Sequence, residues 1–218
     1  MPEQSDTPRD VAPPVLSPGD PATGFDAVVL AGGAASRLGG VDKPGLEVGG
    51  QTLLDAALTA CAGARRTVVV GPVRPVGRTV EWAREEPAGA GPAAALAAGL
   101  AGCTSPYAIV LAADLPFIDA EVVHSLWTTI SGAAESRADG AVAVDESGRA
   151  QWLTACYLRS ALLARIGSFA PDELLGLSLR RLLAGLRLTE VAVPARAAFD
   201  CDTWEQVDAA RGLGAAGG

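Results

Sequence analysis

The sequence of 218 residues has little of what most acid–base or redox enzymes use. It contains a single histidine, His124, within an expected helix, and no G-x-S-x-G segment, so a catalytic triad and histidine-based catalysis are poorly supported. Its four cysteines lie far apart and form no C-x-x-C pair, which argues against a zinc site and against a redox dithiol. We expect reduced, mostly buried thiols.

The chain also lacks an excess of positive charge and a long apolar run. Its formal net charge is −8, and nucleic acids and anionic membranes repel an acidic protein at long range. No apolar run is long enough to span a bilayer, and the N-terminus has no signal-peptide pattern. We therefore expect a cytoplasmic protein without nucleic-acid or membrane partners, in which an anionic ligand meets a local basic site.

One folded domain between two terminal segments is expected. Residues 1–24 are rich in Pro, Asp, Ser and Thr, a composition typical of a disordered tail. Residues 213–218 consist of Gly, Ala and Leu and are expected to form a flexible C-terminus. The segments with apolar periodicity lie in residues 25–212, and 49% hydrophobic content is enough for a substantial core.

Short apolar runs alternate with Ala- and Leu-rich amphipathic stretches in this domain, which predicts βαβ units. The apolar runs are continuous, as is typical of strands covered by helices on both faces. The expected fold is therefore α/β, a three-layer Rossmann-like α/β/α arrangement with a mainly parallel sheet. The expected strands are 25–31, 66–70, 107–113, 140–144, 152–158 and 187–193, and the expected helices are 53–64, 91–102, 119–134, 160–167, 177–186 and 203–212. Some antiparallel pairing is expected in the less regular second half.

A glycine-rich loop follows the first expected strand. The segment AGGAASRLGGVDKP contains Gly32, Gly33 and two cations, Arg37 and Lys43. Glycines let backbone N–H groups approach a ligand, and the cations suit phosphate oxygens, so we predict a polyphosphate-binding loop. The segment matches neither the P-loop nor the dinucleotide fingerprint. The alternative is an ordinary glycine-rich turn.

Asp114 directly follows the expected strand 107–113. Ligands of open parallel sheets bind beyond the carboxyl ends of the strands, so this carboxylate should face the same cleft as the glycine-rich loop. Oxygen ligands are what Mg²⁺ prefers, and we predict Asp114 as a metal ligand. A helix N-cap is the alternative for Asp114 and the preferred interpretation for Asp119.

The loop resembles the signature of a known nucleotidyltransferase family. This family includes molybdenum cofactor guanylyltransferase and, more distantly, the sugar-nucleotide pyrophosphorylases. The resemblance extends from about Phe25 to Arg211, and its motif is formed by Leu30, Ala31, Gly32, Gly33, Arg37, Gly39, Asp42, Lys43 and Pro44.

The resemblance implies a role for each part of the site. The backbone at Leu30, Ala31, Gly32 and Gly33 is expected to meet the base and ribose of the nucleotide. Arg37 and Lys43 would neutralise its phosphates, and Asp114, within a D-x-P motif, would bind Mg²⁺ and nucleotide. Glu86, before the Gly91–Pro92 turn that suits an anion-binding helix start, takes the place of the family's base-contacting Asp, with Glu85 as the competing candidate and two solvated acids as the alternative.

Besides Glu86, three further positions depart from the family pattern. Gly71 follows the strand 66–70 where the family often has Asn, so a base contact is missing or is made by backbone. Asp200 and Asp202 replace amides of a C-terminal N-x-N-T-P segment. Either aspartate is a possible metal or acceptor ligand, with an N-cap as an equal alternative for Asp202. Arg180 and Arg181 are candidates for an acceptor phosphate, although a solvated helix face is the preferred interpretation.

The resemblance implies Mg²⁺-dependent transfer of GMP from GTP to molybdopterin with release of pyrophosphate. A phosphate monoester acceptor is already largely anionic at neutral pH, so the reaction needs no protein base, which agrees with the scarcity of histidine. Two alternatives remain. The first is a related transferase that uses CTP or a sugar phosphate. The second is a noncatalytic domain that binds nucleotide or pterin.

Overall fold

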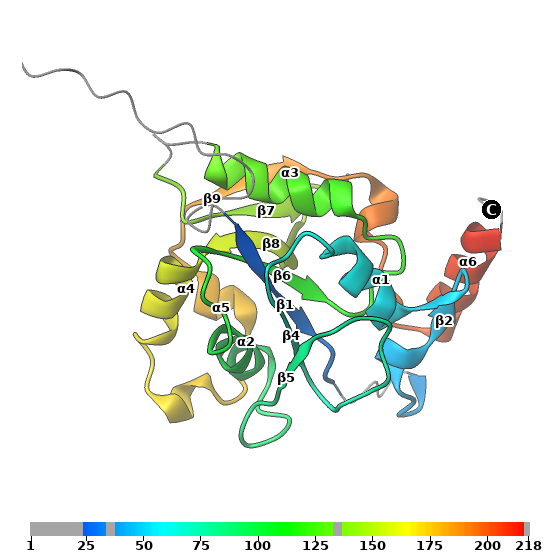
Figure 1. Cartoon of the computed structure of the whole chain (residues 1–218), viewed down its shortest axis with the longest axis horizontal. Helices are drawn as coiled ribbons and strands as arrows, with labels where there is room; N and C mark the ends of the chain where they lie inside the picture. The colour runs from blue at the N-terminus through cyan, green and yellow to red at the C-terminus, as the bar shows by residue number, and fades with distance from the viewer. Residues whose placement is uncertain (1–23, 34–37, 133–136, 216–218) are drawn as a thin grey trace, which may run out of the picture.

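The computed structural model describes residues 24–33, 38–132 and 137–215. A single seven-stranded sheet runs through the molecule, with helices on both faces (Figure 1). The expected three-layer α/β/α fold is therefore confirmed.

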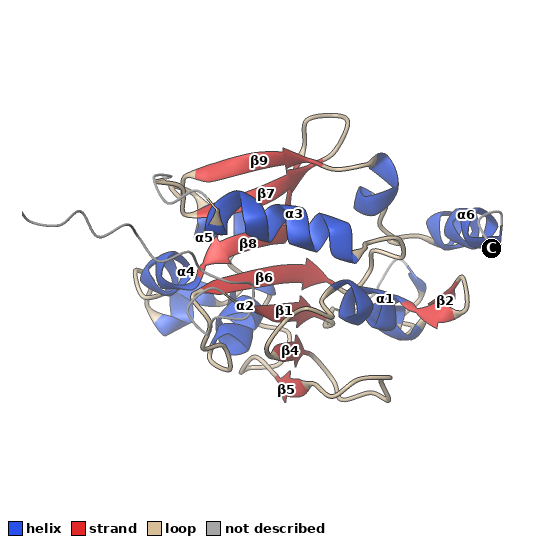
Figure 2. Cartoon of the chain, turned by 45° about the horizontal axis from the view of Figure 1, so that its top comes forward, coloured by secondary structure: helices blue, strands red, loops and turns tan. Residues whose placement is uncertain are grey.

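The strands appear in Figure 2 in the order β5-β4-β1-β6-β8-β7-β9. Their bounds are β1 Phe25–Leu30, β4 Thr67–Val70, β5 Glu81–Ala83, β6 Tyr107–Ala112, β7 Gly140–Val144, β8 Ala150–Leu158 and β9 Leu188–Ala192. β1 lies in the middle of four parallel strands, with Val28 beside Val68 of β4 and beside Val110 of β6. These three valines are buried because helices cover both faces of the sheet.

The sheet has one strand that runs against its neighbours. β8 pairs in antiparallel orientation with both β6 and β7, while β9 pairs parallel to β7. The predicted, mainly parallel sheet is thus correct, and the antiparallel pairing falls in the second half, as expected. It requires no crossover helix between β7 and β8, which are joined by a short turn at residues 145–149.

Two apolar layers flank the sheet. The helices are α1 Leu53–Ala60, α2 Pro92–Leu100, α3 Ala120–Ser131, α4 Arg159–Ile166, α5 Leu179–Leu183 and α6 Trp204–Ala215. Helices α1 and α3 pack on one face, in a cluster that contains Val29 and Leu126. Helices α2, α4 and α5 pack on the other face, in a cluster that contains Val28 and Leu96. Neighbouring residues of β1 therefore point into different halves of the core.

Helix α6 lies to one side of the sheet, beside the small hairpin of β2 Glu47–Val48 and β3 Gln51–Thr52 (Figure 1). Val48 and Leu53 pack with Cys201 and Val207 in a separate apolar cluster. This cluster attaches the C-terminal segment to the segment between β1 and α1. Helix α6 continues to Ala215, three residues beyond the domain boundary expected from the sequence.

Several element boundaries differ from the expectation. The expected helix 177–186 is a single short turn of helix, α5, because Gly185 adopts a positive φ just beyond it. β5 and the β2–β3 hairpin were not predicted. None of the described helices has the length and apolar character needed to cross a membrane.

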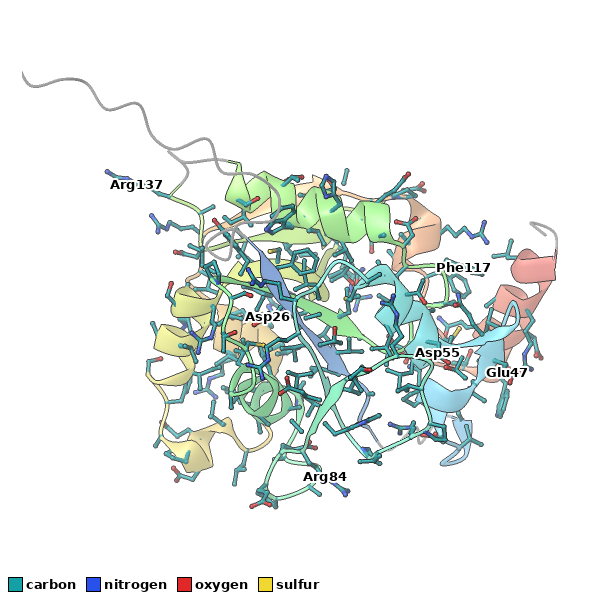
Figure 3. The ribbon with its side chains drawn as sticks, viewed as in Figure 1. Asp26, Glu47, Asp55, Arg84, Phe117 and Arg137 are labelled. Carbon is teal, nitrogen blue, oxygen red and sulfur yellow. The ribbon has the colours of Figure 1, made fainter. Side chains whose placement is uncertain are left out.

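Buried polar groups also hold the layers together. Asp26 on β1 is fully buried, and its carboxylate accepts hydrogen bonds from the backbone N–H groups of Thr104 and Ser105 and from the Ser105 hydroxyl. Figure 3 shows Asp26 inside the fold, whereas Arg84 and Arg137 project from its periphery. Asp26 therefore connects the start of β1 to the loop before β6, at the edge of the sheet opposite to the carboxyl ends of β1 and β6.

Candidate active site

Three side chains from three separate segments meet beyond the carboxyl end of β6. Lys43 Nζ donates hydrogen bonds to Asp114 Oδ2 at 2.7 Å and to Asp202 Oδ1 at 2.6 Å. Lys43 begins the 3₁₀ helix η2, Lys43–Gly45, Asp114 follows β6, and Asp202 precedes α6. The fold thus brings together three of the residues that the sequence analysis selected.

The ion pairs change the ionisation of Lys43. Burial alone would lower the pKa of its ammonium group, but the carboxylates of Asp114 and Asp202 outweigh burial and raise this pKa above its ordinary value. Lys43 is therefore fully charged at neutral pH. The pKa of Asp200 is also raised, by burial and by the negative charges of Asp202 and Asp114.

Lys43 is held in place through its neighbour Asp42. The guanidinium of Arg74 binds the Asp42 carboxylate, with Nε at 2.9 Å from Oδ1 and 2.8 Å from Oδ2. These hydrogen bonds lower the pKa of Asp42 despite its partial burial. Because Arg74 lies in the loop after β4, the ion pair connects two loops at the carboxyl ends of the strands.

The C-terminal segment is fixed against Asp114 by backbone and side-chain bonds. Cys201 N donates to the carbonyl oxygen of Asp114 at 3.1 Å. Thr203 and Gln206 form a capping box, in which Gln206 N donates to Thr203 Oγ1 and Gln206 Oε1 accepts from Thr203 N. Thr203 is therefore the N-cap of α6, and the N-cap alternative for Asp202 is wrong. For Asp119 the N-cap interpretation is confirmed, since its carboxylate accepts from Val122 N.

A glycine-lined cavity of about 320 Å³ lies between the first loop and the start of α2. Gly91 is the N-cap of α2, and Pro92 occupies the first helical position. A helix N-terminus carries partial positive charge and N–H groups without partners in the helix, so this wall of the cavity suits an anionic or polar ligand. The residues that line the cavity are Leu30, Gly32, Gly33, Glu85, Gly89, Gly91, Pro92, Ala95, Ala112, Asp114 and Leu153.

Two carboxylates line this cavity, Asp114 after β6 and Glu85 on the side of the turn before α2. Glu85 Oε1 accepts a hydrogen bond from Gly89 N at 3.0 Å, which orders the turn before α2. The expected residue, Glu86, is exposed and is not among the described residues that line the cavity. The structure thus favours Glu85 over Glu86 as the carboxylate that contacts the base.

The backbone of Gly71 packs closely against the backbone of Ala31 and Gly32. A Cβ atom on Gly71 would lie 2.7 Å from Ala31 O and 3.1 Å from Gly32 N, and the φ of Gly71 is +149°. Neither Gly71 nor the buried Ala31 lines the glycine-lined cavity. Their contact instead places the backbone that leads to Gly32 and Gly33.

A second cavity, of about 560 Å³, lies beside the first and is named here the β8 cavity. Asp114, Ala112 and Leu153 line both cavities, so the aspartate stands at their junction. The other residues that line the β8 cavity are Leu115, Arg149, Ala150, Gln151, Trp152, Thr154, Leu179, Arg180 and Asp200. Apart from Arg180 and Asp200, these residues carried no recognisable sequence signal.

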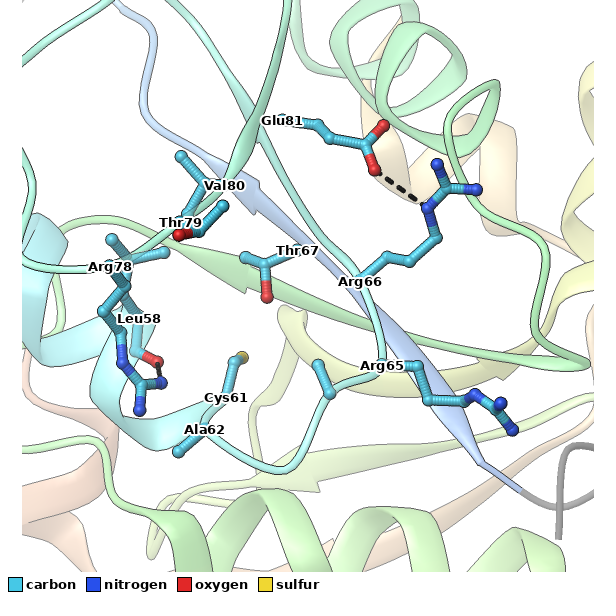
Figure 4. Close-up of a pocket in the computed structure, with 11 residues that line it drawn as sticks. Leu58, Cys61, Ala62, Arg65, Arg66, Thr67, Arg78, Thr79, Val80 and Glu81 are labelled. Carbon is cyan, nitrogen blue, oxygen red and sulfur yellow. Dashed lines mark hydrogen bonds and ion pairs between the residues drawn. The ribbon is translucent and has the colours of Figure 1, made fainter. Parts of the chain in front are cut away.

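An arginine-lined cavity of about 390 Å³ lies at the opposite edge of the sheet, where β4 and β5 begin (Figure 4). Arg66 Nε donates to Glu81 Oε1 at 2.8 Å, and Arg78 Nη1 donates to Leu58 O at 2.9 Å, near the end of α1. Figure 4 shows these two guanidinium groups on opposite sides of the cavity. Both cations already have structural partners, and this is not the edge at which parallel sheets bind ligands.

Arg37, the second predicted cation of the first loop, lies outside the described residues. No group of three or more His, Cys, Asp or Glu side chains able to hold a metal is present in the described part of the chain. Asp114 and Asp202 nevertheless converge on one cation, the Lys43 ammonium. Mg²⁺ is commonly bound by one or two carboxylates together with water and substrate phosphates, so this donor set fits the expected ion.

Comparison with solved structures identifies the fold class. The chain superposes on molybdopterin-guanine dinucleotide biosynthesis protein A from Archaeoglobus fulgidus with a TM-score of 0.66 and 19% identity, covering 88% of this chain and 99% of that one. It superposes on 2-C-methyl-D-erythritol 4-phosphate cytidylyltransferase from Thermus thermophilus with a TM-score of 0.63 and 21% identity, covering 87% and 98%. The fold is therefore that of the Rossmann-like nucleotidyltransferases.

The family follows from the sequence comparison. The model of the MobA-like NTP transferase domain matches residues 27–191, and the chain belongs to this family. A curated relative from Natronomonas pharaonis, named probable molybdenum cofactor guanylyltransferase, is 31% identical over 111 residues, which cover 46% of this chain and 54% of the relative. The chain thus spans little more than half the length of the first curated relatives that it matches.

Proposed function

We propose that this protein is a nucleotidyltransferase that moves GMP from GTP to molybdopterin and releases pyrophosphate in a Mg²⁺-dependent reaction. The observation that carries the proposal is the position of Asp114. It lines both the glycine-lined cavity and the β8 cavity and binds the partly buried cation Lys43. A transferase needs two substrates that meet at one charged centre, and this geometry provides for it.

The glycine-lined cavity is proposed to hold the nucleotide. Backbone at Leu30, Gly32 and Gly33 would approach the base and ribose, and the start of α2 adds the polar wall described above. Glu85 supports a guanine ligand, because a carboxylate accepts hydrogen bonds from guanine N–H groups. CTP remains the alternative, since the superposed Thermus protein is named a cytidylyltransferase and Gly71 offers no side chain for base recognition.

The proposed reaction is an in-line displacement. An oxygen of the acceptor phosphate forms a bond to the α-phosphorus of GTP, and the bond from this phosphorus to the bridging oxygen of the β-phosphate breaks as pyrophosphate leaves. Lys43, with its raised pKa, stays charged and offsets the negative charge of the phosphates. Binding in the two adjoining cavities would also hold the acceptor phosphate in line with the α-phosphorus, which lowers the entropic part of the activation barrier.

Asp114 and Asp202 are the residues proposed to hold Mg²⁺. When bound, the ion would supply further charge neutralisation and polarise phosphate oxygens. The two carboxylates now share the Lys43 ammonium, so Lys43 itself keeps them close together before any ion arrives. Placement of this chemistry in the cytoplasm remains a prediction.

The test is pyrophosphate release with Mg²⁺ and molybdopterin, with GTP, CTP, ATP and UTP compared and glucose 1-phosphate as a parallel acceptor. Selective use of GTP with molybdopterin is the expected result. Asp114→Ala is expected to reduce turnover by about 10²-fold or more, with an unchanged circular dichroism spectrum. Binding of nucleotide without pyrophosphate release from any pair would favour the noncatalytic alternative and overturn the proposal.

A further inference from the structure

An irregularity in β8 opens the β8 cavity. Val142 of β7 pairs with Ala155, but the next residue, Ala143, pairs with Gln151, so residues 152–154 of β8 have no partner on β7. These three residues and Gln151 all line the cavity. Bulges of this kind redirect side chains and often lie next to functional sites.

Arg149 is placed at this cavity by the turn between β7 and β8. The Asp145 carboxylate accepts hydrogen bonds from Ser147 N, Ser147 Oγ and Arg149 N through Oδ1, and from Gln151 Nε2 through Oδ2. Together these bonds lower the pKa of Asp145 to about 2. One carboxylate thus orders the whole turn and the two polar residues that follow it.

Arg180 reaches the same cavity from helix α5. Leu179, Leu182 and Leu183 are buried, which fixes the rotation of this short helix. As a result Arg180 lines the cavity, whereas the adjacent Arg181 does not. The sequence gives no reason to choose between Arg180 and Arg181 as a ligand-binding residue. Their positions in the structure favour Arg180.

Two arginines and two aspartates line the cavity, and the arginines are the groups that could bind an anion. Within the described ranges, the guanidinium groups of Arg149 and Arg180 take part in no ion pair. The aspartates at the other lining positions, Asp114 and Asp200, repel anions, as does the formal net charge of −8. An anionic ligand would therefore enter only if local cations attract it, and arginine binds phosphate oxygens in a bidentate manner.

We propose that Arg149 and Arg180 bind the phosphate monoester of the acceptor in the β8 cavity. This assignment rests on the proposed function, because it identifies the second substrate's site by its charge. The cavity also has an apolar lining from Leu115, Leu153 and Trp152, which suits an acceptor with a ring system rather than a bare sugar phosphate. Arg149 and Arg180 thus offset the charge of the attacking phosphate, while Lys43 offsets the charge of the nucleotide phosphates.

The test compares Arg180→Ala with Arg181→Ala, which removes the same charge from the next, also exposed, position of the same helix. Arg149→Ala is the second variant. We expect Arg180→Ala and Arg149→Ala each to raise the KM and the directly measured Kd for molybdopterin about tenfold, equivalent to about 1.4 kcal/mol. The Kd for GTP should stay unchanged, and Arg181→Ala should match the wild type in every measurement. Thermal unfolding of the three variants checks that α5 stays folded.

The outcomes separate this inference from the proposed function. Equal molybdopterin affinity in the wild type, Arg149→Ala and Arg180→Ala would overturn the inference, even if the wild type turns over. Wild-type binding of molybdopterin that depends on both arginines, without pyrophosphate release, would support the inference and overturn the proposed function. Tighter binding of glucose 1-phosphate than of molybdopterin would overturn the preference for a ring-bearing acceptor.

Discussion

Asp202 faces Lys43 because its neighbour Thr203 caps helix α6. The Thr203–Gln206 capping box satisfies the backbone N–H groups at the helix start, so the Asp202 carboxylate is not needed there. It binds the Lys43 ammonium at 2.6 Å instead. A single position in the cap thus decides whether an aspartate stabilises a helix or belongs to the site.

From this contact we predict that Asp202→Ala reduces turnover by about tenfold, less than Asp114→Ala, because Asp202 lines neither cavity. The measurement is kcat for pyrophosphate release. Asp208→Ala is the matched control, since it removes the same charge from α6 at an exposed residue whose partner is Arg211. Equal activity of the two variants would exclude Asp202 from the site.

Gly71 yields a second prediction. Asn at this position, the amide that the family often carries, should lower stability by about 1–3 kcal/mol and weaken GTP binding, because its Cβ would displace the backbone at Ala31 and Gly32. The measurements are urea unfolding and the Kd for GTP. Gly185→Ala is the control. Gly185 also has a positive φ, +91°, but a Cβ atom added there would have no atom within 4 Å beyond its chain neighbours. A tighter GTP complex in Gly71→Asn would contradict this account.

The residues of the site that could be predicted from the sequence belong to recognisable motifs, among them Asp202 before α6. Lys43 and Asp114 were predicted because the glycine-rich loop and β6 are clear in the pattern, and the structure joins them. Glu85 and Glu86 could not be separated, since a turn has no periodicity that shows which side chain points inward. Arg149 was not found at all, because its position depends on a turn and on an irregular strand pairing far from the motif.

At the scale of elements, the turn between β7 and β8 positions two residues of the β8 cavity, Arg149 and Gln151. We predict that Asp145→Ala raises the KM for molybdopterin more than that for GTP, because Arg149 N and Gln151 lose their common acceptor. Steady-state kinetics measure this difference. Glu146→Ala, an exposed neighbour in the same turn, is the control, and an equal effect of both substitutions would contradict the role of Asp145.

The same carboxylate predicts how the turn depends on pH. The folded-state pKa of Asp145 is about 2, below its ordinary value of 3.8. A lowered pKa contributes stability that is present above the ordinary value and lost as the pH falls through the folded value. The wild type should therefore lose this contribution between about pH 4 and pH 2, whereas Asp145→Ala should lack it at every pH. Unfolding curves against pH measure the difference.

The central elements of the fold were predictable because burial on both faces leaves long apolar runs, as in β1 and β6. β5 escaped prediction because it has three residues, of which Glu81 is exposed and the other two are only half-buried. The β2–β3 hairpin did carry a signal: Gly49 and Gly50 adopt positive φ values in its two-residue turn. Its strands have two residues each, which is too short for an alternating pattern to be recognised.

At the scale of the whole molecule, the core contains the four cysteines that the sequence analysis expected to be reduced. All four are buried free thiols. Burial raises the pKa of Cys61 to about 12, of Cys103 to about 12 and of Cys201 to about 11. These thiols should therefore react slowly with a disulfide reagent at pH 8, and all four should react at once in urea. Rapid labelling of the folded protein would contradict the burial of these thiols in the three apolar clusters.

The whole molecule is organised so that two cavities meet at Asp114, one on the side of the glycine-rich loop and one on the side of β8. The most direct test of this arrangement follows a label from GTP to product. With GTP labelled at the α-phosphorus, Mg²⁺ and molybdopterin, we predict that the label appears in a pterin–guanine dinucleotide, while a γ-label appears in pyrophosphate. Recovery of the α-label only in GTP or free GMP would contradict nucleotidyl transfer by this site.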